Sequence, residues 1–524
     1  MRVNSHFIVG VLMVAGVAYV PTMAVAGQTT ARYAIVIGHN QAESADLATL
    51  RYADDDAIRT YQLLALTADT SRLLVDPDAE TRRLYGVVGD GPPSRGAVLD
   101  AFDWAARRMD EDRQNGILPT LYVVYTGHGS YDDRGRGFVY LSDGVLTTLD
   151  LYRSLFDAVG GSPVILMVDA CNAAMLVRSR SPGSTSDRRK VQKSNLKLED
   201  YPNVGVILSS SGTGEVHEWG RYLGGVFSHE VRSALMGPGD LDGDGAITFP
   251  ELATFVHAAN DAVDNPGVRL KPYIRPPLGL PNYPVIVLRD LRFPVKISIP
   301  KQIMGRGHVV DHKLVRHADF FRKTEQSFVL GIPRMDGPWV VVIDDTEWVV
   351  PQHSNGIVML TDLESRPRTT LAQRSATSEY LDNTLFKRPL TPEFTSHYLT
   401  GDYVESLTVV REVPDPWYKN TLGWSLVGGG VLVAGAGVTC HALGLEAENE
   451  SRTAKFTIDR ERANKDASQF RIATGVLYGV GAAAIVGGVT SFLLEQPSRL
   501  ETFSPPLRVD IGPAGITLSG PLPQ

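Results

Sequence analysis

The stretch Val164-Ile165-Leu166-Met167-Val168-Asp169-Ala170-Cys171-Asn172-Ala173 decides the fold that we expect. Its leading aliphatic residues show no helical period, which is typical of a strand buried on both faces of a parallel sheet. Ligands and reactive groups collect at the carboxyl ends of such strands. Cys171, one of only two cysteines in 524 residues, stands at this end. The stretch therefore predicts an α/β domain with a cysteine placed for chemistry.

Strands and helices alternate on either side of this stretch. Apolar runs at 33–37, 121–126 and 204–208 indicate further buried strands, whereas the segments that follow Asp54 and Ser94 have helical patterns. Alternation of this kind indicates a mainly parallel sheet flanked by helices. We expect this α/β domain to occupy residues 30–290.

Composition excludes some classes of protein. Hydrophobic residues make up 43% of the chain and charged residues 21%, as in ordinary folded proteins. The net charge of −8 argues against a nucleic-acid partner. A disulfide is improbable because Cys440, the second cysteine, lies inside a long apolar segment. The sequence gives no sign of an organic cofactor.

The N-terminus has the order of a secretory signal peptide. Arg2 precedes an apolar core from Phe7 to Val20, and Ala24-Val25-Ala26 provides a small-residue cleavage site. We expect residues 1–26 to be this signal, with an uncleaved membrane anchor as the alternative. Either interpretation predicts an exported chain.

Two further segments are apolar enough to cross a membrane. Residues 421–445 and 472–494 are rich in glycine and alanine, and Gly475 and Gly479 form a small-xxx-small pair suited to close helix contact. The basic connection at 446–471 predicts a cytoplasmic loop by the positive-inside rule. This hairpin would anchor the chain in a bacterial inner membrane with the α/β domain in the periplasm. The alternative is a pair of glycine-rich helices inside a soluble core.

Two parts of the chain carry no assigned chemistry. Residues 291–412 lose the helical alternation and predict a small β-rich domain. Residues 495–524 alternate apolar with polar or small residues and predict a short extracytoplasmic hairpin.

A thiol at pH 7 needs a nearby base to become a nucleophile. His128 lies just past the strand at 121–126, between two glycines. Parallel strands end at one edge of a sheet, so His128 and Cys171 can face each other. The amides of Gly129 and Cys171 could then form an oxyanion hole. Taken singly, the cysteine could be a packed hydrophobic residue and the glycine-flanked histidine a turn.

These residues also carry a resemblance. Tyr125-Thr126-Gly127-His128-Gly129 and Val168-Asp169-Ala170-Cys171 resemble the motifs of caspase-like cysteine peptidases (peptidase C14), in particular the bacterial and metacaspase branch. The segments 33–38 and 50–57 are similar to the opening of that family. The resemblance implies a caspase-haemoglobinase fold and a Cys/His dyad. The chain departs from the metacaspase pattern at Asn172-Ala173-Ala174, where His-Ser-Gly is usual.

The resemblance also implies a specificity. It places Asp169 and Asp56 in the pocket for the substrate side chain, and two carboxylates suit a guanidinium or an ammonium group. We therefore expect protein substrates cut after Arg or Lys. Asp56 could instead serve only as an acid at a helix start. The basic loop at 178–198 could be a self-processing site, or simply a solvated charged loop.

Residues 240–251 match a twelve-residue calcium loop of the EF-hand type. Oxygen ligands occupy the required positions, and Gly245 supplies the turn. The expected Ca²⁺ ligands are Asp240, Asp242, Asp244, the Ala246 carbonyl, Thr248 and Glu251. Gly237-Pro238-Gly239 interrupts the entering helix, and no second loop is visible, so a structural site is favoured over a sensor.

Together these features favour a membrane-tethered, exported cysteine endopeptidase. A catalytically weak relative, acting as a calcium-dependent scaffold anchored in the membrane, is the alternative from another class. A clostripain- or gingipain-like peptidase would share the chemistry with a different domain layout.

Overall fold

The computed structural model describes most of the chain and divides it into two compact units, residues 1–405 and 406–524. The predicted signal peptide and nearly all of the basic loop at 178–198 lie outside the described residues. The described ranges are 29–41, 47–86, 88–132, 136–177, 197–210, 218–265, 268–323, 326–368, 376–399, 409–414, 420–494, 498–503, 508–512 and 515–519.

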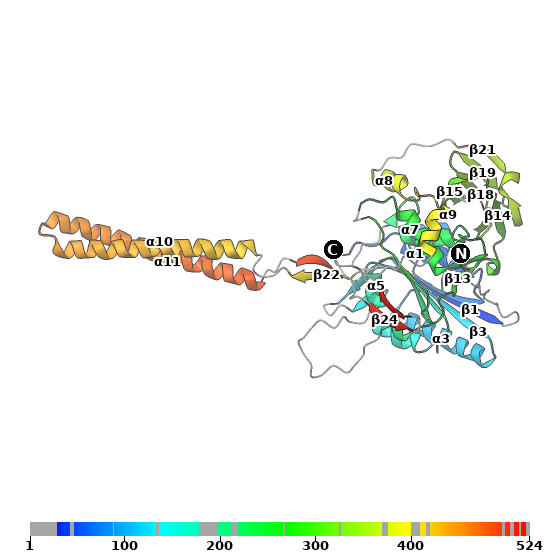
Figure 1. Cartoon of the computed structure of the whole chain (residues 1–524), viewed down its shortest axis with the longest axis horizontal. Coiled ribbons are helices and arrows are strands. Elements are labelled where there is room, and N and C mark those ends of the chain that lie inside the picture. The colour runs from blue at the N-terminus through cyan, green and yellow to red at the C-terminus, as the bar shows by residue number, and fades with distance from the viewer. Residues whose placement is uncertain are drawn as a thin grey trace, which may run out of the picture. The chain divides into compact units, whose positions relative to one another are not determined.

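A six-stranded sheet forms the centre of the first unit, in the order β12-β8-β7-β3-β1-β2 (Figure 1). All neighbouring strands are parallel except β12 on β8. Every residue of the strand at 164–169 is buried, as its aliphatic run predicts. The prediction of a mainly parallel sheet is confirmed. The bounds are β1 (Thr30–His39), β2 (Thr70–Val75), β3 (Leu118–Gly127), β7 (Val164–Asp169), β8 (Val204–Leu208) and β12 (Tyr273–Arg275).

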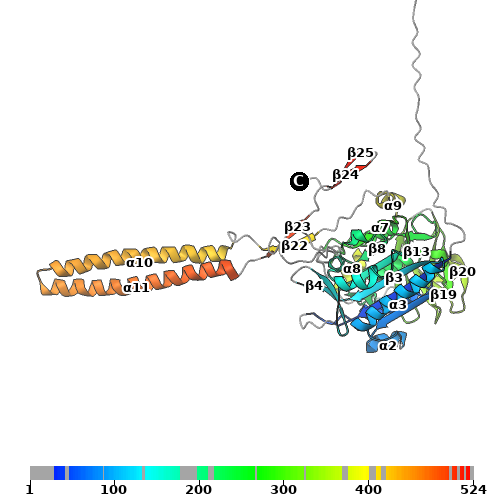
Figure 2. The ribbon, with the colours of Figure 1, turned by 90° about the horizontal axis from the view of Figure 1, so that it is seen from below.

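Helices flank this sheet, and α3 lies along it against β1 and β3 (Figure 2). Three aspartates occupy the first turn of α1, where the helix dipole favours negative charge. The helices are α1 (Ala53–Leu64), α2 (Ala79–Tyr85), α3 (Arg95–Gln114), α4 (Thr148–Asp150), α5 (Ala173–Leu176), α6 (Val226–Leu235) and α7 (Phe249–Asn260), with a π-helix, η1 (Leu151–Phe156), and a short 3-10 turn, η2 (Leu198–Asp200).

Small sheets surround the central one. Strand β4 pairs with β5 and β5 with β6, β9 pairs with β10, and β11 pairs with β13. The strands are β4 (Gly129–Tyr131), β5 (Gly137–Leu141), β6 (Gly144–Thr147), β9 (Glu218–Trp219), β10 (Gly224–Gly225), β11 (Ala246–Thr248) and β13 (Pro284–Val287), and the 3-10 turn η3 (Leu288–Asp290) follows.

Residues 295–367 form two further sheets, β17-β14-β20 and β16-β15-β18-β19-β21. The prediction for 291–412 omitted two helices, α8 (Ala376–Thr384) and α9 (Pro392–Leu399). The strands are β14 (Val295–Ile299), β15 (Gly305–Asp311), β16 (Arg316–Arg322), β17 (Phe328–Ile332), β18 (Trp339–Ile343), β19 (Thr346–Val350), β20 (Gly356–Met359) and β21 (Glu364–Pro367), and η4 (Leu360–Asp362) lies before β21.

The strand-rich segment shares one hydrophobic core with the α/β part, so the predicted boundary at residue 291 does not separate two compact units. Strand β16 packs on α6, and the Gly331 N–H donates to the Met236 carbonyl at 2.7 Å. A sequence pattern shows that a strand has an apolar face, but not which element covers it.

The second unit contains a long helical hairpin, α10 (Thr421–Thr453) and α11 (Thr457–Leu494), whose helices run side by side (Figures 1 and 2). Both are long and apolar enough to cross a membrane. They extend well into the predicted loop at 446–471, which leaves only residues 454–456 between them. Antiparallel pairs β22 (Val409–Pro414) with β23 (Ser498–Phe503), and β24 (Arg508–Gly512) with β25 (Gly515–Ser519), complete the unit.

Small residues at seven-residue spacing bring α10 and α11 together. A Cβ atom on Gly430 would lie 2.7 Å from the Gly481 carbonyl oxygen, and one on Gly488 would lie 2.7 Å from that of Gly423. Gly475 and Gly479 have no atom within 4 Å of the corresponding position. The expectation that this pair mediates close helix contact is therefore wrong for the α10–α11 packing, because both glycines face away from α10.

Candidate active site

Two neighbouring strand ends bring the histidine and cysteine segments together. Strands β3 and β7 are paired in parallel with Thr126 opposite Asp169, so His128 and Cys171 follow at equivalent positions. A Cβ atom on Gly129 would overlap the Cys171 carbonyl oxygen and would lie 3.0 Å from the Ala170 Cβ. Glycine is therefore required at 129 for the two backbones to touch.

His128 is buried and its ring is fixed by the backbone. Its Nε2 lies 2.9 Å from the Ala48 carbonyl oxygen, which can only accept, so Nε2 carries the hydrogen. Nδ1 is then the ring nitrogen with a free lone pair in the neutral form. Burial lowers the pKa of His128, and the bond to Ala48 opposes this only in part. The imidazole is accordingly neutral at pH 7 and can accept a proton.

The hydrogen bonds around His128 leave the N–H of Gly129 outside the pairing of β4 and β5. The His128 carbonyl accepts from the Tyr140 N–H at 3.1 Å and from the Tyr125 hydroxyl at 2.9 Å. This ladder bond makes Gly129 and Val139 a non-hydrogen-bonded pair of β4 and β5. The Gly129 N–H is therefore not used in that pairing.

Cys171 is partly exposed and sits at the turn between β7 and α5. Ser209, at the end of β8, fixes this turn because its hydroxyl lies 3.1 Å from both the N–H and the carbonyl of Ala170. Asn172 follows in the left-handed conformation, with φ of 58°. Asparagine tolerates this conformation better than most residues. Neither cysteine of the chain forms a disulfide.

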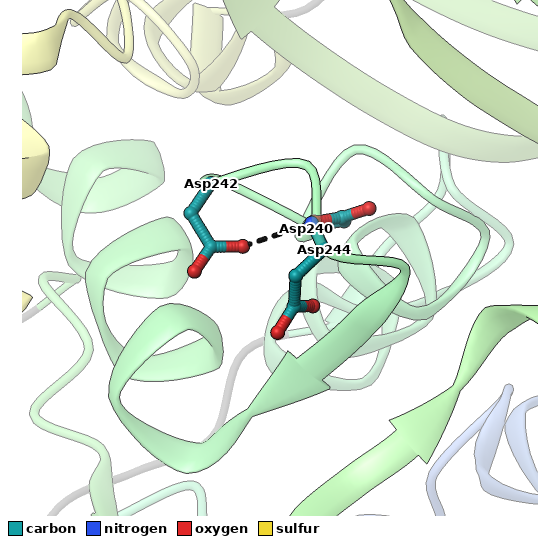
Figure 3. A group of neighbouring side chains, drawn as sticks. All are labelled: Asp240, Asp242 and Asp244. Atoms are coloured by element: carbon teal, nitrogen blue, oxygen red, sulfur yellow. Dashed lines mark hydrogen bonds between the residues drawn. The ribbon is translucent and has the colours of Figure 1, made fainter. Parts of the chain in front are cut away.

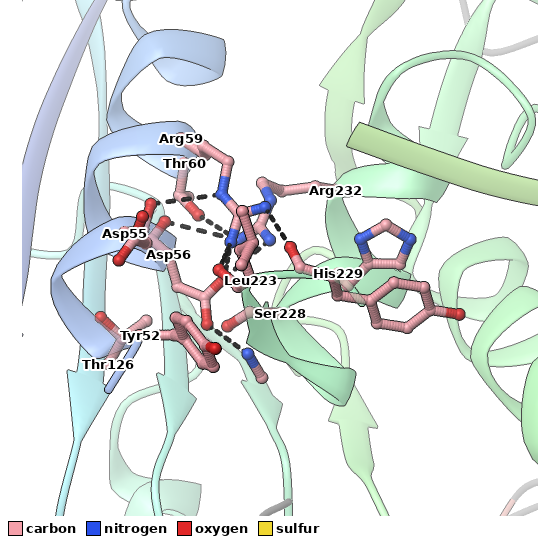
Figure 4. Close-up of polar contacts among 12 residues, drawn as sticks. Tyr52, Asp55, Asp56, Arg59, Thr60, Thr126, Leu223, Ser228, His229 and Arg232 are labelled. Carbon is pink, nitrogen blue, oxygen red and sulfur yellow. Dashed lines mark hydrogen bonds and ion pairs between the residues drawn. The ribbon is translucent and has the colours of Figure 1, made fainter. Parts of the chain in front are cut away.

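Asp56 is buried between α1 and α6 and is hydrogen-bonded to residues of both segments (Figure 4). Its Oδ1 accepts from the Arg59 guanidinium at 2.9 Å and from that of Arg232 at 2.7 Å. Its Oδ2 accepts from the Gly225 N–H at 2.6 Å. The two arginines come from α1 and α6 and converge on one carboxylate, so Asp56 ties these helices together.

Asp169 is also buried but has a different environment. Its Oδ2 accepts from the N–H of Ser228 at 3.1 Å and from its hydroxyl at 2.5 Å. Its Oδ1 is buried and has no hydrogen-bond partner among the described residues. Burial raises the pKa of Asp169 to about 7, against the opposing effect of the Ser228 hydroxyl. The structure thus places Asp56 and Asp169 on either side of Gly225, with different freedom to bind a ligand.

The predicted calcium loop gathers three of its six expected ligands (Figure 3). One carboxylate oxygen from each of Asp240, Asp242 and Asp244 lies within 4.8 Å of the others. Glu251 is instead hydrogen-bonded to other residues of the loop: its Oε1 accepts from the N–H groups of Leu241 at 2.9 Å and Asp242 at 3.4 Å, and its Oε2 accepts from the Thr248 N–H at 2.9 Å and hydroxyl at 2.8 Å. Thr248 and Glu251 thereby form the capping box of α7.

The strand of this loop, β11, pairs with β13, with Ala246 opposite Val287. Helix α6 stops at Leu235, before the glycines at 237 and 239, as the sequence predicts. The strand beside this loop is therefore β13 of the same unit. In paired EF-hands, a second calcium loop would lie at this position.

One known protein family has a model that matches this part of the chain. Residues 31–271 match the family model described as the caspase domain. This part of the chain is therefore similar to the caspase domain. The matched range contains the candidate dyad, the two aspartates predicted for the pocket and the predicted calcium loop.

Two solved structures are similar to about half of the chain. A crystal structure of a protein from Geobacter sulfurreducens is 15% identical, with a TM-score of 0.32, and the match covers 49% of this chain and 99% of that one. The structure described as pro-sf-caspase-1 is 14% identical, with a TM-score of 0.29, over 47% of this chain and 87% of that one. No curated protein matches the chain.

The sequence did not point to several residues between 31 and 271 that shape the candidate site. Ala48 acts through its backbone carbonyl, which leaves no trace in residue type. Arg59, Arg232 and Ser228 lie in helices where a charged or hydroxyl side chain is ordinary. The Gly224-Gly225 pair before α6 was a usable signal, because adjacent glycines often mark a close backbone approach.

Proposed function

We propose that the chain is a cysteine endopeptidase that uses Cys171 as nucleophile and His128 as base. The observation that carries this proposal is the His128 ring: its Nε2–H is held by the Ala48 carbonyl, beside a backbone contact with the Cys171 turn. This arrangement supports Nδ1 as the atom that takes the thiol proton. The caspase-domain match supports the same reaction class.

In the proposed reaction, the Cys171 thiolate attacks the peptide carbonyl and forms a tetrahedral intermediate. The Gly129 and Cys171 amides would stabilise its oxyanion. Protonated His128 then gives its proton to the leaving amine, and water hydrolyses the resulting thioester with His128 again acting as base.

The test is cleavage of fluorogenic peptides that end in Arg or Lys by the purified full-length chain in detergent. We expect cleavage by the wild type and none above background by Cys171→Ala or His128→Ala. Equal rates for wild type and Cys171→Ala would overturn the proposal and favour the scaffold alternative. Mass spectrometry of the same samples tests self-processing, which predicts a cut between 178 and 198 that is absent from Cys171→Ala.

Specificity for a basic side chain is part of the proposal. The support is Asp169, a buried carboxylate at the end of β7, two residues before the proposed nucleophile, one oxygen of which has no hydrogen-bond partner in the described part of the chain. A cation in this position would satisfy that oxygen. Peptides with a neutral side chain at the cleavage site should therefore be poor substrates.

Calcium binding at 240–251 is a second part of the proposal. The donor set fits a hard cation, because Asp240, Asp242 and Asp244 supply clustered carboxylates and the Ala246 carbonyl lies in the same loop. Glu251 would complete the set by leaving its capping box. Isothermal titration with Ca²⁺, beside Asp242→Asn and Asp244→Asn, tests the site, and unchanged heats in both variants would exclude it.

We further propose that α10 and α11 tether the caspase-like domain to a membrane, with that domain outside the cytoplasm. The support is their length, apolarity and mostly exposed surface. Carbonate extraction of membranes from expressing cells should leave the full chain in the pellet. A variant that ends at residue 405 should be released.

A further inference from the structure

Two arginines, Arg306 on β15 and Arg368 just after β21, have no carboxylate partner among the described residues. Both residues are partly buried. One nitrogen of Arg306 donates to the Asp382 carbonyl at 2.8 Å, whereas its Nε is buried and has no acceptor in the described part of the chain. Charged groups that are withdrawn from water are normally paired, so these two arginines are exceptions.

The turn between β18 and β19 holds these two arginines near each other. The Asp344 N–H donates to the Arg306 carbonyl at 3.0 Å, and the Arg368 N–H donates to the Asp345 carbonyl at 2.8 Å. Asp344 and Asp345 are themselves exposed, so water screens their carboxylates. His308 lies two residues after Arg306 on β15 and therefore shares its face of the sheet.

His308 is buried, and its ring has no hydrogen-bond partner among the residues that the structure describes. Burial lowers its pKa well below the usual value, and the charges of Arg316, Arg368 and Arg221 add to this effect against the opposing effect of Asp319. The ring is therefore neutral and offers one N–H donor. The influence of Arg368 also indicates that its guanidinium, and not only its backbone, lies near His308.

The buried carboxylates of this cluster are already used. Both oxygens of Asp319 bind the Arg316 guanidinium, and Asp382 is paired with Arg221. Each of these pairs balances its own charge, which leaves the charges of the two remaining arginines uncompensated. An excess of two positive charges in a partly buried place is costly unless an anion offsets it.

A buried hydroxyl adds a further free donor. The Tyr222 side chain lies against Arg316, whose guanidinium is 5.6 Å from the centre of its ring. The Tyr222 hydroxyl is buried and has no partner within the described ranges. Burial raises the pKa of Tyr222 well above its usual value, and Arg306 is near enough to oppose this rise. The groups without a partner here, Arg306 Nε, the Tyr222 hydroxyl and the His308 N–H, can all donate, which favours a ligand rich in acceptors.

We propose that Arg306, Arg368 and His308 bind a small oxyanion with two negative charges, of the inorganic phosphate type. Guanidinium groups present paired N–H donors to phosphate oxygens, and two charges on the ligand match the excess of two on the protein. Water would satisfy the free donors but not the charge, and a cation would be repelled. All three residues lie outside the range that matches the caspase-domain model, and the inference does not depend on the proposed endopeptidase function.

Isothermal titration of the full-length chain with sodium phosphate tests the site. The protein is kept in detergent with a calcium chelator, and sodium chloride holds the ionic strength constant so that screening does not change. We expect saturable binding by the wild type. Arg306→Gln and Arg368→Gln should each raise Kd about tenfold or more, because each loses a charge-assisted hydrogen bond. Sodium acetate, an oxyanion with a single charge, should bind more weakly than phosphate.

Arg107→Gln and Arg136→Gln are the matched controls. Each removes one exposed arginine that is paired with an aspartate four residues before it, outside the strand-rich segment. Both variants should keep the wild-type Kd. An equal loss of affinity in the controls and in the site variants would show that phosphate responds to net charge alone, and would overturn the inference.

Thermal unfolding separates binding from a structural role. Arg368→Gln removes a charge that has no partner among the described residues, so its melting temperature in chloride should be no lower than that of the wild type. Phosphate should raise the melting temperature of the wild type, and that of Arg368→Gln much less. No saturable binding by the wild type, an unchanged Kd in both glutamine variants, or equal affinity for acetate would each overturn the inference.

Discussion

The part of the chain that matches the caspase-domain model contains two groups of acidic residues that are built in opposite ways. In the loop at 240–251, the aspartates accept hydrogen bonds from backbone N–H groups only two to five residues away. In the pair proposed for the pocket, Asp56 and Asp169, the partners of Asp56 lie up to 176 residues away and Ser228 lies 59 residues from Asp169. The loop acids are exposed or partly exposed, whereas the pocket acids are buried.

This difference distinguishes carboxylates that are still able to bind a cation from carboxylates that already have partners within the chain. Local turns hold the loop carboxylates near one another without neutralising them, so their mutual repulsion can be relieved by a divalent cation. Tertiary contacts pair Asp56 with two arginines and, among the described residues, give one oxygen of Asp169 no hydrogen-bond partner. The same residue type therefore has a structural role at one position and, in the proposed function, a binding role at another.

The largest effect is expected where a buried ion pair is broken. Asp56→Ala leaves Arg59 and Arg232 without their shared carboxylate and should lower the free energy of unfolding by about 3–5 kcal/mol. Thermal and urea unfolding of the full chain would measure this. Asp103→Ala, which removes the exposed pair with Arg107, should cost less than about 1 kcal/mol. Equal costs would contradict the contrast between buried and local acids.

Calcium should stabilise the domain through the loop alone. At a free concentration of 100 times Kd, binding to the folded state adds about 2.7 kcal/mol to the free energy of unfolding. The melting temperature should rise with Ca²⁺ and fall back with chelator. Asp244→Asn should weaken this response, whereas Asp103→Asn, an exposed position outside the loop, should leave it intact. A response that survives Asp244→Asn would place the ion elsewhere.

The raised pKa of Asp169 gives a pH-dependent difference in stability. Burial raises this pKa from 3.8 to about 7, so between these values the folded chain holds a proton that the unfolded chain has lost. The wild type therefore loses stability as pH rises through this window, and Asp169→Asn does not. From pH 5 to pH 6, the variant should gain about 1.4 kcal/mol relative to the wild type, as measured by urea unfolding. The gain should level off above pH 7, and a constant difference from pH 4 to pH 7 would contradict the assignment.

The smallest effect concerns the capping box of the loop. In chelator, Glu251→Ala removes the acceptor for the Thr248 and Leu241 N–H groups and should cost about 1 kcal/mol. Glu251→Gln keeps an acceptor and should cost less. Thermal unfolding of both variants without calcium measures the local contribution. No loss in either variant would show that the capping box adds nothing to stability.

Features set by local spacing could be predicted from the sequence. The apolar run at 164–168 predicted a strand buried on both faces because all of its side chains are apolar. The twelve-residue spacing specified the calcium loop, whose aspartates the structure gathers as expected. The long apolar runs specified the C-terminal helices, but not their full length, because polar residues beyond the runs continue the same helices.

Features set by the path of the chain could not be predicted. No sequence spacing predicts the contact of Ala48 with His128, or of Ser228 with Asp169, because the residues of each pair are distant in sequence and the tertiary structure brings them together. The strand-rich segment likewise shows apolar faces in sequence, and only the structure reveals that α6 and the α/β core cover them.

The sequence by itself determined that a cysteine and a histidine stand at neighbouring strand ends, that two aspartates accompany them, and that an acidic loop follows. These depend on residue type and short-range pattern. The tertiary structure alone decided which nitrogen of His128 is held, which aspartate is paired with arginine, and which buried oxygen of Asp169 has no hydrogen-bond partner among the described residues. The physical reason is that burial and pairing set the state of a charged group, and both are made by residues distant in the chain.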